Sequence, residues 1–403
     1  MNNDLFNFTP EMQLLLACCT VSMKQDDWDR KESLDKLLSS IDKERIDWSE
    51  FLNLIDRHRV HSLVYRNIHK YATEHIPAHV ELALKKRSRK KSRQMLNLTA
   101  ELRRLSKLFA QHDIFMLSFK GPALSQQLFG NLGLRYCKDL DLLVKPEELD
   151  QAEQLLLSDG YRRQRLDFAL TPRQKKAYLK QWHHVSYYHP ERQIIVELHW
   201  RLCSNPHLLP STYLQRMIET TQQLSIAGTQ ITSLSDEDTL LYLCLHGANH
   251  GWYRLKWLCD VAQFLHRDQA INWQAWVENV LALTLHRPVA QALLLAHQLF
   301  DAPLPPATRP LTAEDQIIPQ LVAHSIRVLT QSEEELFAVG GLNRWRNIPY
   351  RIKLKADLGY RWSNFSQIWL SIDDCKRYPL PDVLFPLYYI LGPFSWLRRR
   401  FSF

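Results

Sequence analysis

The sequence predicts an α/β (α+β) protein in which a small mixed sheet is flanked by helical regions at both ends. A short apolar segment, Ile114–Phe119, stops at Gly121 and leads into a helix signal. An apolar segment over 137–144 carries an Asp-x-Asp pattern, and two strand-like segments over 184–189 and 193–199 are joined by a short turn. Before and after this part, apolar residues recur at helical spacing.

The 403 residues are enough to bury a substantial core and to form two or three domains or subdomains. We expect an N-terminal helical region over 1–94, a central core over 95–234 and a C-terminal helical region over 235–403. The net charge of +8 and pI near 9.0 favour anionic partners such as nucleotides, RNA or anionic lipid head groups.

Cysteine usage and the N-terminal sequence predict a cytoplasmic protein. Seven cysteines form no Cys-x-x-Cys pair, as is typical of free thiols in a reducing compartment. The first ten residues lack the order of a signal peptide, and no run of 18 apolar residues predicts a transmembrane helix.

The N-terminal region is expected to be helical. Leu34, Leu37, Leu38 and Ile41 recur at helical spacing in one of its segments. A long helix is predicted over 78–111, and seven of the nine residues from Lys85 to Arg93 are cationic. Two interpretations stay open: a solvated helix face, or a phosphate-binding track for RNA or an acidic partner.

The stretch from Phe119 to Val144 holds the densest chemical pattern. Pro122 suits the first turn of a helix that ends near Gly130. Side chains alternate along a strand, so Asp139 and Asp141 should point the same way with Cα atoms about 6.5 Å apart. Paired carboxylates repel unless a cation lies between them, and magnesium takes oxygen ligands. This frame therefore suits a metal-bound polyphosphate.

The segments after Val144 supply a third acid. A helix is expected from Lys145-Pro146 to Asp159-Gly160, then a strand near 161–168 and a short helix from Thr171-Pro172 that could lie over the cleft. Glu197 lies among apolar residues of the second hairpin strand, where a carboxylate is costly without a metal, a proton or a basic partner. An exposed edge-strand position is the alternative. His199 could approach the same cleft.

The C-terminal region reads as helices that begin at the cap signal of Ser235. His246 and His250 share one helix face, and a zinc site with Asp260, closure of a nucleotide cleft and interhelical packing all stay open. Further helices are predicted over 313–329 and 350–358. The apolar segment 383–397 precedes Arg398, Arg399 and Arg400. It either docks on the protein core or lies at a membrane surface.

The motifs at 119–144 resemble the polymerase β-like nucleotidyltransferase superfamily, and most closely its bacterial branch of nucleotidyltransferase family proteins. The resemblance rests on Lys-Gly-x-Ala-Leu, an Arg four residues before the first Asp, and Asp-Leu-Asp-Leu-Leu-Val. It extends to the segment around Glu197 and to His246, His250, Trp257 and Asp260, and it covers roughly 95–265. The superfamily has Gly-Ser where this chain has Lys120-Gly121, so a serine contact to phosphate is not implied here.

The resemblance implies a metal-dependent enzyme that moves an NMP group from an NTP, such as ATP, to a hydroxyl acceptor and releases pyrophosphate. Asp139, Asp141 and Glu197 would be the catalytic, metal-binding acids for two Mg²⁺ ions, with Mn²⁺ as a substitute. Lys120, Gly121 and Arg135 would contact the nucleotide, although Lys120 could instead pair with an acid in an inactive site. The acceptor stays open among a small molecule, a glycan precursor, a protein and tRNA, as in toxin-like relatives. A non-catalytic nucleotide-binding or scaffold protein is the alternative, and the C-terminal residues 383–403 could place the protein peripherally at the inner membrane.

Overall fold

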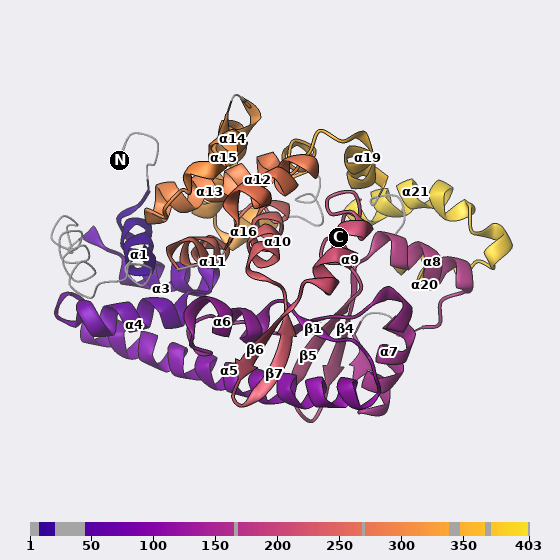
Figure 1. The fold of residues 1–403 in the computed structure, drawn as a ribbon, viewed down its shortest axis with the longest axis horizontal. Helices are drawn as coiled ribbons and strands as arrows, with labels where there is room; N and C mark the ends of the chain where they lie inside the picture. The colour runs from indigo at the N-terminus through magenta and orange to yellow at the C-terminus, as the bar shows by residue number, and fades with distance from the viewer. Residues whose placement is uncertain are drawn as a thin grey trace.

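One 34-residue helix, α5 (Ala78–Gln111), runs along one side of the molecule, as Figure 1 shows. The fold is that of a computed structural model, which describes residues 8–20, 45–164, 168–267, 271–313, 315–337, 347–366 and 372–401. The predicted helix over 78–111 is confirmed with both of its ends. The predicted helix containing Leu34, Leu37, Leu38 and Ile41 lies outside the described residues.

The main sheet has five strands in the order β1-β2-β5-β4-β3. Its strands are β1 (Leu117–Ser118), β2 (Leu140–Leu143), β3 (Arg162–Arg163), β4 (His184–His189) and β5 (Ile194–His199). The β2–β5 pair is parallel and the other pairs are antiparallel, so the sheet is mixed as the sequence predicts. The strand expected over 114–119 is shorter than predicted, because only its last residues pair with β2.

The register of the sheet decides which side chains share a face. Asp141 pairs with Glu197 across β2 and β5, and His199 pairs with His184 across β5 and β4. Neighbouring partners in a sheet point to the same side, and so do residues two apart in one strand. These four side chains therefore occupy one face. The alternate residues, such as Leu142 and Leu198, face the core that contains α5.

Helices precede the main sheet in the chain and also connect its strands. The N-terminal helices are α1 (Pro10–Thr20), α3 (Trp48–His58), α4 (His61–Tyr71) and η3 (Thr73–His75). Around the sheet lie α6 (Gly121–Phe129), η4 (Pro146–Glu148), α7 (Leu149–Ser158), α8 (Pro172–Gln181) and α9 (Ser211–Glu219). The Thr171 side chain caps α8 in a reciprocal capping box with Gln174, as the Thr-Pro signal predicts.

A second, two-stranded sheet pairs β6 (Gln222–Ile226) with β7 (Thr229–Ser233). The turn between them is Ala227-Gly228, and both residues have positive φ, 47° and 78°. Two positive φ angles match the twist of a tight hairpin. The sequence analysis did not predict this hairpin, because Ala227 is an unusual residue in a turn that favours Asn or Asp.

The C-terminal helices fold back over the sheet face that carries Asp141. They are α10 (Asp236–Asn249), α11 (Leu255–His266), α12 (Trp273–Ala282), α13 (His286–Phe300), η5 (Pro306–Thr308), α14 (Arg309–Thr312), α15 (Ile317–Thr330), α16 (Glu333–Phe337), α18 (Ile348–Arg351), α19 (Leu358–Ser366), α20 (Ile372–Arg377), η6 (Asp382–Leu384) and α21 (Leu387–Phe401). The helix predicted over 350–358 is wrong: Asp357 accepts a hydrogen bond from the Tyr360 N–H at 2.6 Å, so a new helix begins there.

Two hydrophobic cores lie on opposite sides of the sheet. One joins the N-terminal helices, α10, α11, α13 and α15. The other lies between the sheet, α7 and the C-terminal part of α5. Helix α5 contributes Val80 and Leu84 to the first core and Leu98, Leu102 and Phe109 to the second. The boundaries at 94 and 234 remain predictions, and residue 94 lies inside α5.

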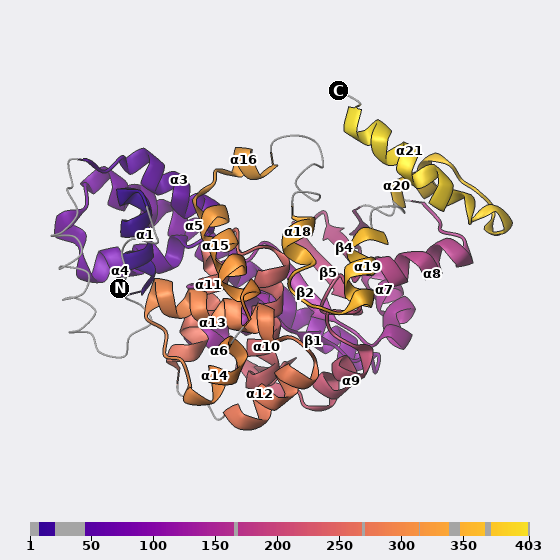
Figure 2. The ribbon, with the colours of Figure 1, turned by 90° about the horizontal axis from the view of Figure 1, so that it is seen from above.

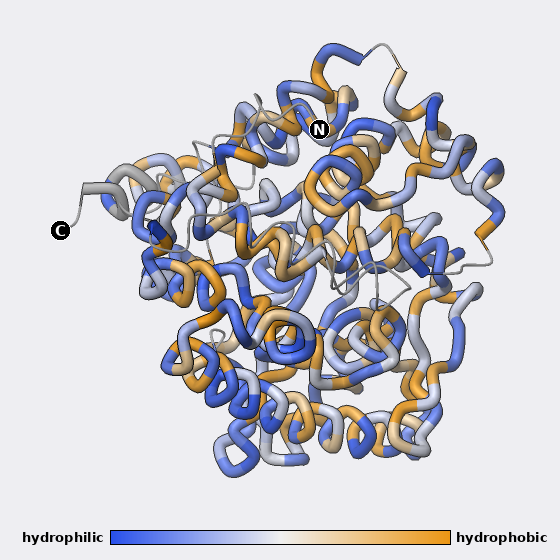
Figure 3. The backbone as a smooth tube through the Cα atoms, turned by 90° about the vertical axis from the view of Figure 1, so that its left-hand side faces the viewer, coloured by the Kyte–Doolittle hydropathy of each residue, from blue (hydrophilic) through white to orange (hydrophobic). Residues whose placement is uncertain are grey.

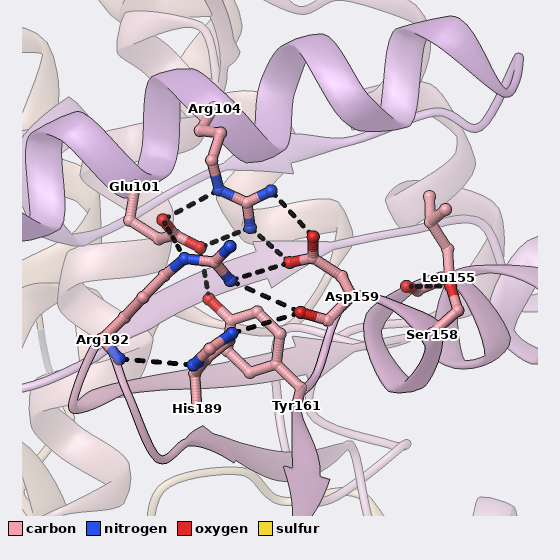
Figure 4. Close-up of polar contacts among 8 residues, drawn as sticks. All are labelled: Glu101, Arg104, Leu155, Ser158, Asp159, Tyr161, His189 and Arg192. Carbon is pink, nitrogen blue, oxygen red and sulfur yellow. Dashed lines mark hydrogen bonds and ion pairs between the residues drawn. The ribbon is translucent and has the colours of Figure 1, made fainter.

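A polar network fixes α5 to the strands (Figure 4). Arg104 lies between Glu101 and Asp159, donating from Nε to Glu101 at 3.0 Å and from Nη1 to Asp159 at 2.9 Å. The Tyr161 hydroxyl donates to Glu101 at 2.7 Å, and Arg192 donates to Asp159 at 3.1 Å. The buried Glu101 carboxylate therefore has both an arginine and a tyrosine partner, which offsets the cost of its burial.

The C-terminal helix α21 extends from one edge of the molecule (Figure 2). Figure 3 shows hydrophobic and hydrophilic residues alternating along the backbone. Among the residues that the structure describes, no helix combines the length and apolar character needed to cross a membrane.

Candidate active site

A cavity of about 740 Å³ lies between the polar sheet face and the C-terminal helices. Its wall includes Asp139, Asp141, Glu197 and His199 from the sheet side, His246, His250 and Trp257 from the α10–α11 side, and Tyr350 and Arg351 from α18. Such a volume is within the range of small-molecule sites. We call this cavity the cleft.

The predicted acids all line the cleft. Asp141 and Glu197 are register partners on neighbouring parallel strands, and Asp139 lies directly before β2. One ligand atom each from Asp141, Glu197 and His199 can be chosen so that all three lie within 4.8 Å of one another. Burial, together with the negative charges of Asp141 and Glu197, raises the pKa of Asp139 to about 6. The structure thus gathers negative charge at one place.

Lys120 balances part of this charge. Its Nζ lies 2.9 Å from Asp141 Oδ1, and its ammonium lies 5.2 Å from the ring centre of Phe119 and 5.6 Å from that of Tyr242. Burial lowers the pKa of Lys120, but attraction to Asp141 outweighs it and raises the pKa above its usual value. The ion pair that the sequence analysis weighed for Lys120 is present in this structure.

Gly121 makes the turn from β1 into α6. Its φ is +61°, in the left-handed region that a residue with a Cβ adopts only at a cost. This conformation places Lys120 as the residue that precedes the helix, beside the Asp141 carboxylate. The backbone at position 121 therefore favours glycine, and this position lies next to the acids.

Arg135 binds Asp260 rather than any of the three predicted acids. The guanidinium donates from Nε and Nη2 to the two carboxylate oxygens at 2.7 and 2.9 Å, and both side chains are buried. Its third nitrogen, Nη1, is buried without a hydrogen-bond partner, and Arg135 lines the cleft. Asp260 is thereby engaged with Arg135, away from any ligand role with His246 and His250.

His246 and His250 belong to an aromatic cluster on the cleft wall. Their ring centres lie 4.7 Å apart, and both rings pack on Trp257 at 5.2 and 5.0 Å. The Tyr242 hydroxyl lies 3.2 Å from His246 Nδ1. Within the described ranges, neither histidine belongs to a group of three residues able to hold a metal ion. The two histidines therefore pack against Trp257 of α11 and also line the cleft.

Two further histidines line the cleft that sequence reasoning did not single out. His184 begins β4 and His183 directly precedes it, with ring centres 4.8 and 5.4 Å from that of His199. His184 Nε2 lies 3.6 Å from Glu197 Oε1. The signal was present as His-His at the start of a strand whose hairpin partner carries Glu197, but only the register shows that they meet.

Cations from outside the sheet also reach the cleft. Arg59 follows α3 with a φ of +59° and lines the cavity. On α5, Lys91 is half-buried over the Tyr136 ring, and Lys256 donates to the Tyr136 carbonyl at 3.0 Å. Burial, Arg135 and other groups lower the pKa of Lys256 to about 7. Arg59 escaped sequence reasoning because the N-terminal helices carry no dense motif.

Comparisons with known proteins show the family of the chain. The sequence profile of the family described as "Uncharacterised nucleotidyltransferase" matches residues 44–301, well over half of the chain. A crystal structure of an antigenic nucleotidyltransferase-like protein from Paracoccidioides brasiliensis is similar at 16% identity and a TM-score of 0.29, over 53% of this chain and 95% of that one. No curated protein matches the chain. The span of the profile match shows that the chain belongs to this family of uncharacterised nucleotidyltransferases.

Proposed function

We propose that the chain transfers an NMP group from an NTP to a hydroxyl acceptor and releases pyrophosphate, with a polymerase β-like arrangement of its acids. The observation that carries the proposal is the convergence of Asp139, Asp141 and Glu197 on one cleft beside Lys120 and Gly121. All seven cysteines are free, which suits the cytoplasmic location that we also propose.

The donor set fits a divalent cation. Asp139, Asp141 and Glu197 offer carboxylate oxygens, the ligands that magnesium prefers, and burial together with the charges of Asp141 and Glu197 raises the pKa of Asp139. We propose that these residues hold Mg²⁺, two ions when the triphosphate is bound, or Mn²⁺ in its place. The cation would neutralise charge on the transferring phosphorus and the leaving pyrophosphate.

The remaining residues act on the nucleotide and the acceptor. Lys120 can exchange its contact with Asp141 for a phosphate oxygen, since its flexible side chain carries a point charge. The Nη1 nitrogen of Arg135 has no hydrogen-bond partner and can donate to the nucleotide, and Asp260 holds the guanidinium plane in place. Glu197 would orient or deprotonate the acceptor hydroxyl. Gly121 lets the backbone approach the phosphates.

The test uses Asp139→Asn, with Glu191→Gln in the exposed turn of the β4–β5 hairpin as the control. Each purified protein is incubated with each labelled NTP and a cell extract. We expect Asp139→Asn to lower label transfer by at least about 100-fold, in line with the loss of a group that stabilises transition-state charge. Its melting temperature should be equal or higher, because the substitution removes repulsion from Asp141 and Glu197. Full activity of Asp139→Asn would refute the proposal.

RNA is the acceptor that one further observation favours. Burial lowers the pKa of Lys91, and so do Lys138 and Arg59. Arg59 also lowers the pKa of Lys138, so positive charge extends from the basic part of α5 to the Asp139 side of the cleft. A polyanion would relieve this repulsion. Label should then enter the RNA fraction, and Lys91→Gln should weaken incorporation more at low salt than at high salt, because salt screens the contact of Lys91 with phosphate. Label confined to protein or small molecules would exclude RNA.

A non-catalytic role predicts different binding. If Lys120 neutralised Asp141 permanently, the cleft would ignore nucleotides. Calorimetric titration with ATP, GTP, CTP and UTP in the presence of magnesium separates the two cases. We expect heat of binding from at least one NTP, and no heat from any of the four would favour the scaffold.

A further inference from the structure

We propose that the cleft binds a divalent transition-metal ion through the imidazoles of His183, His184 and His199, next to the carboxylates. The proposal deepens the proposed function, because it concerns the same cleft, but it makes a separate claim about which metal binds there. Imidazole nitrogen suits Zn²⁺ and its neighbours in the first transition row, whereas Mg²⁺ prefers oxygen.

The sheet register brings the three rings together. His184 and His199 are directly paired across β4 and β5, and His183 immediately precedes β4. One ring nitrogen from each can be chosen so that all three lie within 4.8 Å of one another. His183 Nε2 and His184 Nδ1 are 3.2 Å apart. Rings so placed can turn their nitrogens towards a common point.

The ring nitrogens of His199 carry the second observation. His199 is 1% exposed, and neither of its nitrogens makes a hydrogen bond in the described structure. Its Nε2 nevertheless lies 3.3 Å from Asp141 Oδ1 and 3.4 Å from Glu197 Oε2. Its Nδ1 is also buried without a hydrogen bond, and a buried polar atom without one is costly. A nitrogen held between two carboxylates without hydrogen-bond geometry fits coordination to a shared cation.

His199 joins two ligand groups. It belongs both to the histidine group and to the group formed with Asp141 and Glu197. The carboxylates can bind Mg²⁺ through oxygen atoms alone, and the three imidazoles offer nitrogen ligands beside them. We therefore expect Zn²⁺ and Co²⁺ to bind where the histidines lie and to depend on them, and Mg²⁺ to depend on Asp139.

The first experiment measures metal content and ligand type directly. Tag-free protein is stripped with a chelator and dialysed against Zn²⁺ or Co²⁺, and bound metal is counted by mass spectrometry. We expect one equivalent, with a visible Co²⁺ absorption of the intensity typical of four- or five-coordinate sites. Less than a tenth of an equivalent in the wild-type protein, or only the weak absorption of six-coordinate Co²⁺, would overturn the proposal.

The second experiment uses His184→Gln, with the exposed His207→Gln as the matched control. Losing a ligand should weaken Zn²⁺ binding by more than the roughly 10- to 100-fold that loss of an outer-shell partner costs. Unchanged Zn²⁺ affinity and an unchanged Co²⁺ spectrum in a folded His184→Gln protein would overturn the histidine site. If Mg²⁺-dependent transfer then persists, the proposed function survives, so the two failures are distinguishable.

A different observation carries a second inference, that the C-terminal segment binds an anionic lipid surface. Helix α21 and the preceding η6 expose apolar side chains to solvent: Val383 is 84% exposed, Ile390 61% and Phe394 66%. No charged residue lies between Asp382 and Arg398. Ile390 and Phe394 are one turn apart and so share a helix face.

The charge around this patch selects the partner. Lys376 and Arg377 are exposed on α20, and Arg398, Arg399 and Arg400 follow the apolar stretch in sequence. These five cations outnumber the three acids of the same region, Asp373, Asp374 and Asp382. Exposed apolar area flanked by cations is the pattern of helices that lie in the interface of an anionic bilayer. The edge position of α21 leaves room for a flat surface (Figure 2).

Vesicle co-sedimentation tests this inference with the full chain. We expect pelleting with phosphatidylglycerol vesicles and little with pure phosphatidylcholine. The double variant Ile390→Ser/Phe394→Ser should lose it, and Leu82→Ser, which alters a residue of α5 that is 68% exposed, should retain it. Equal pelleting of wild type and double variant would overturn the inference. So would light scattering that shows a wild-type dimer and a monomeric double variant, since a second copy would then cover the patch.

Discussion

At the residue scale, the ion pair between Lys120 and Asp141 is the central contact of the cleft. The side chain of Lys120 is mostly buried and its Nζ lies 2.9 Å from the carboxylate. If it transfers this contact to a nucleotide phosphate, its loss should affect the enzyme–nucleotide complex more than the fold.

We expect Lys120→Met to raise KM for the NTP by roughly 10- to 100-fold, about 1.4–2.8 kcal/mol of lost binding. The matched variant Lys107→Met changes a lysine near the far end of α5, away from the cleft. Steady-state kinetics and thermal melting of both proteins check the expectation. A Lys120→Met protein that melts much lower but binds NTP normally would assign Lys120 to the fold alone.

Substitutions at the two glycines that flank α6 can distinguish a cost in stability from an effect on the cleft. Gly121 and Gly130 have φ of +61° and +59° and flank the same helix, and a Cβ on either would meet no atom closer than 3.6 Å. An alanine at each should therefore cost a similar 1–2 kcal/mol in free energy of unfolding. Denaturant titration measures this cost.

Only Gly121→Ala should also lower transfer activity, because Gly121 lies at the acids and Gly130 does not. Activities assayed under conditions where both variants are folded make the comparison. Equal activity of the two would mean that the backbone at Gly121 does not approach the substrate.

At the scale of elements, the ends of α5, the hairpin β4–β5 and the cap of α8 could be predicted, because each has a local cause. Periodic leucines, the Pro190-Glu191-Arg192 turn and Thr171-Pro172 specify their conformations within a few residues. The meeting of His183 with His199 and of Arg135 with Asp260 could not be predicted, because register and helix docking decide them. Alternation along a strand predicts that Asp139 and Asp141 point the same way, whereas the place of Glu197 beside them is implied by the family resemblance. Glu197 approaches Asp141 because β2 and β5 pair in parallel.

The network between α5 and the end of α7 offers a test at this scale. Replacing Arg104 with Met leaves the buried Glu101 with fewer donors, although Tyr161 and Arg192 stay near. We expect a loss of roughly 1–3 kcal/mol in free energy of unfolding. The solvent-exposed pair Lys175–Asp150 is the control, and Lys175→Met should change stability by less than about 1 kcal/mol.

At the scale of the whole molecule, the N-terminal helices are tied to the C-terminal ones through the end of α3. Arg57 donates to the carbonyls of Val328 and Leu329, both at 2.8 Å, and His58 Nδ1 accepts from the Leu255 N–H at 3.1 Å. Accepting at Nδ1 requires a neutral ring. Burial and the nearby Arg57 and Arg254 lower the pKa of His58 well below its usual value.

This contact predicts a pH dependence of stability. Below about pH 6.5 the unfolded chain protonates His58 and the folded chain does not, so the unfolded state binds more protons and stability falls as the pH falls. His58→Asn keeps an acceptor but cannot titrate there, and its stability should fall less between pH 6.5 and 5. Chemical denaturation at several pH values, with the exposed His79→Asn as the control, measures the difference. Parallel curves for His58→Asn and wild type would contradict the assignment.

The shared helix α5 has a consequence for how the molecule comes apart. Helix α5, about 50 Å long, supplies side chains to both cores. Unfolding of either core should therefore destabilise the part of α5 against which the other core packs. Heating should give a single calorimetric peak. A shortened chain starting at residue 95 would begin within α5 and would lack the first part of this helix. The central region should therefore not fold when it is expressed apart from the helical regions on either side.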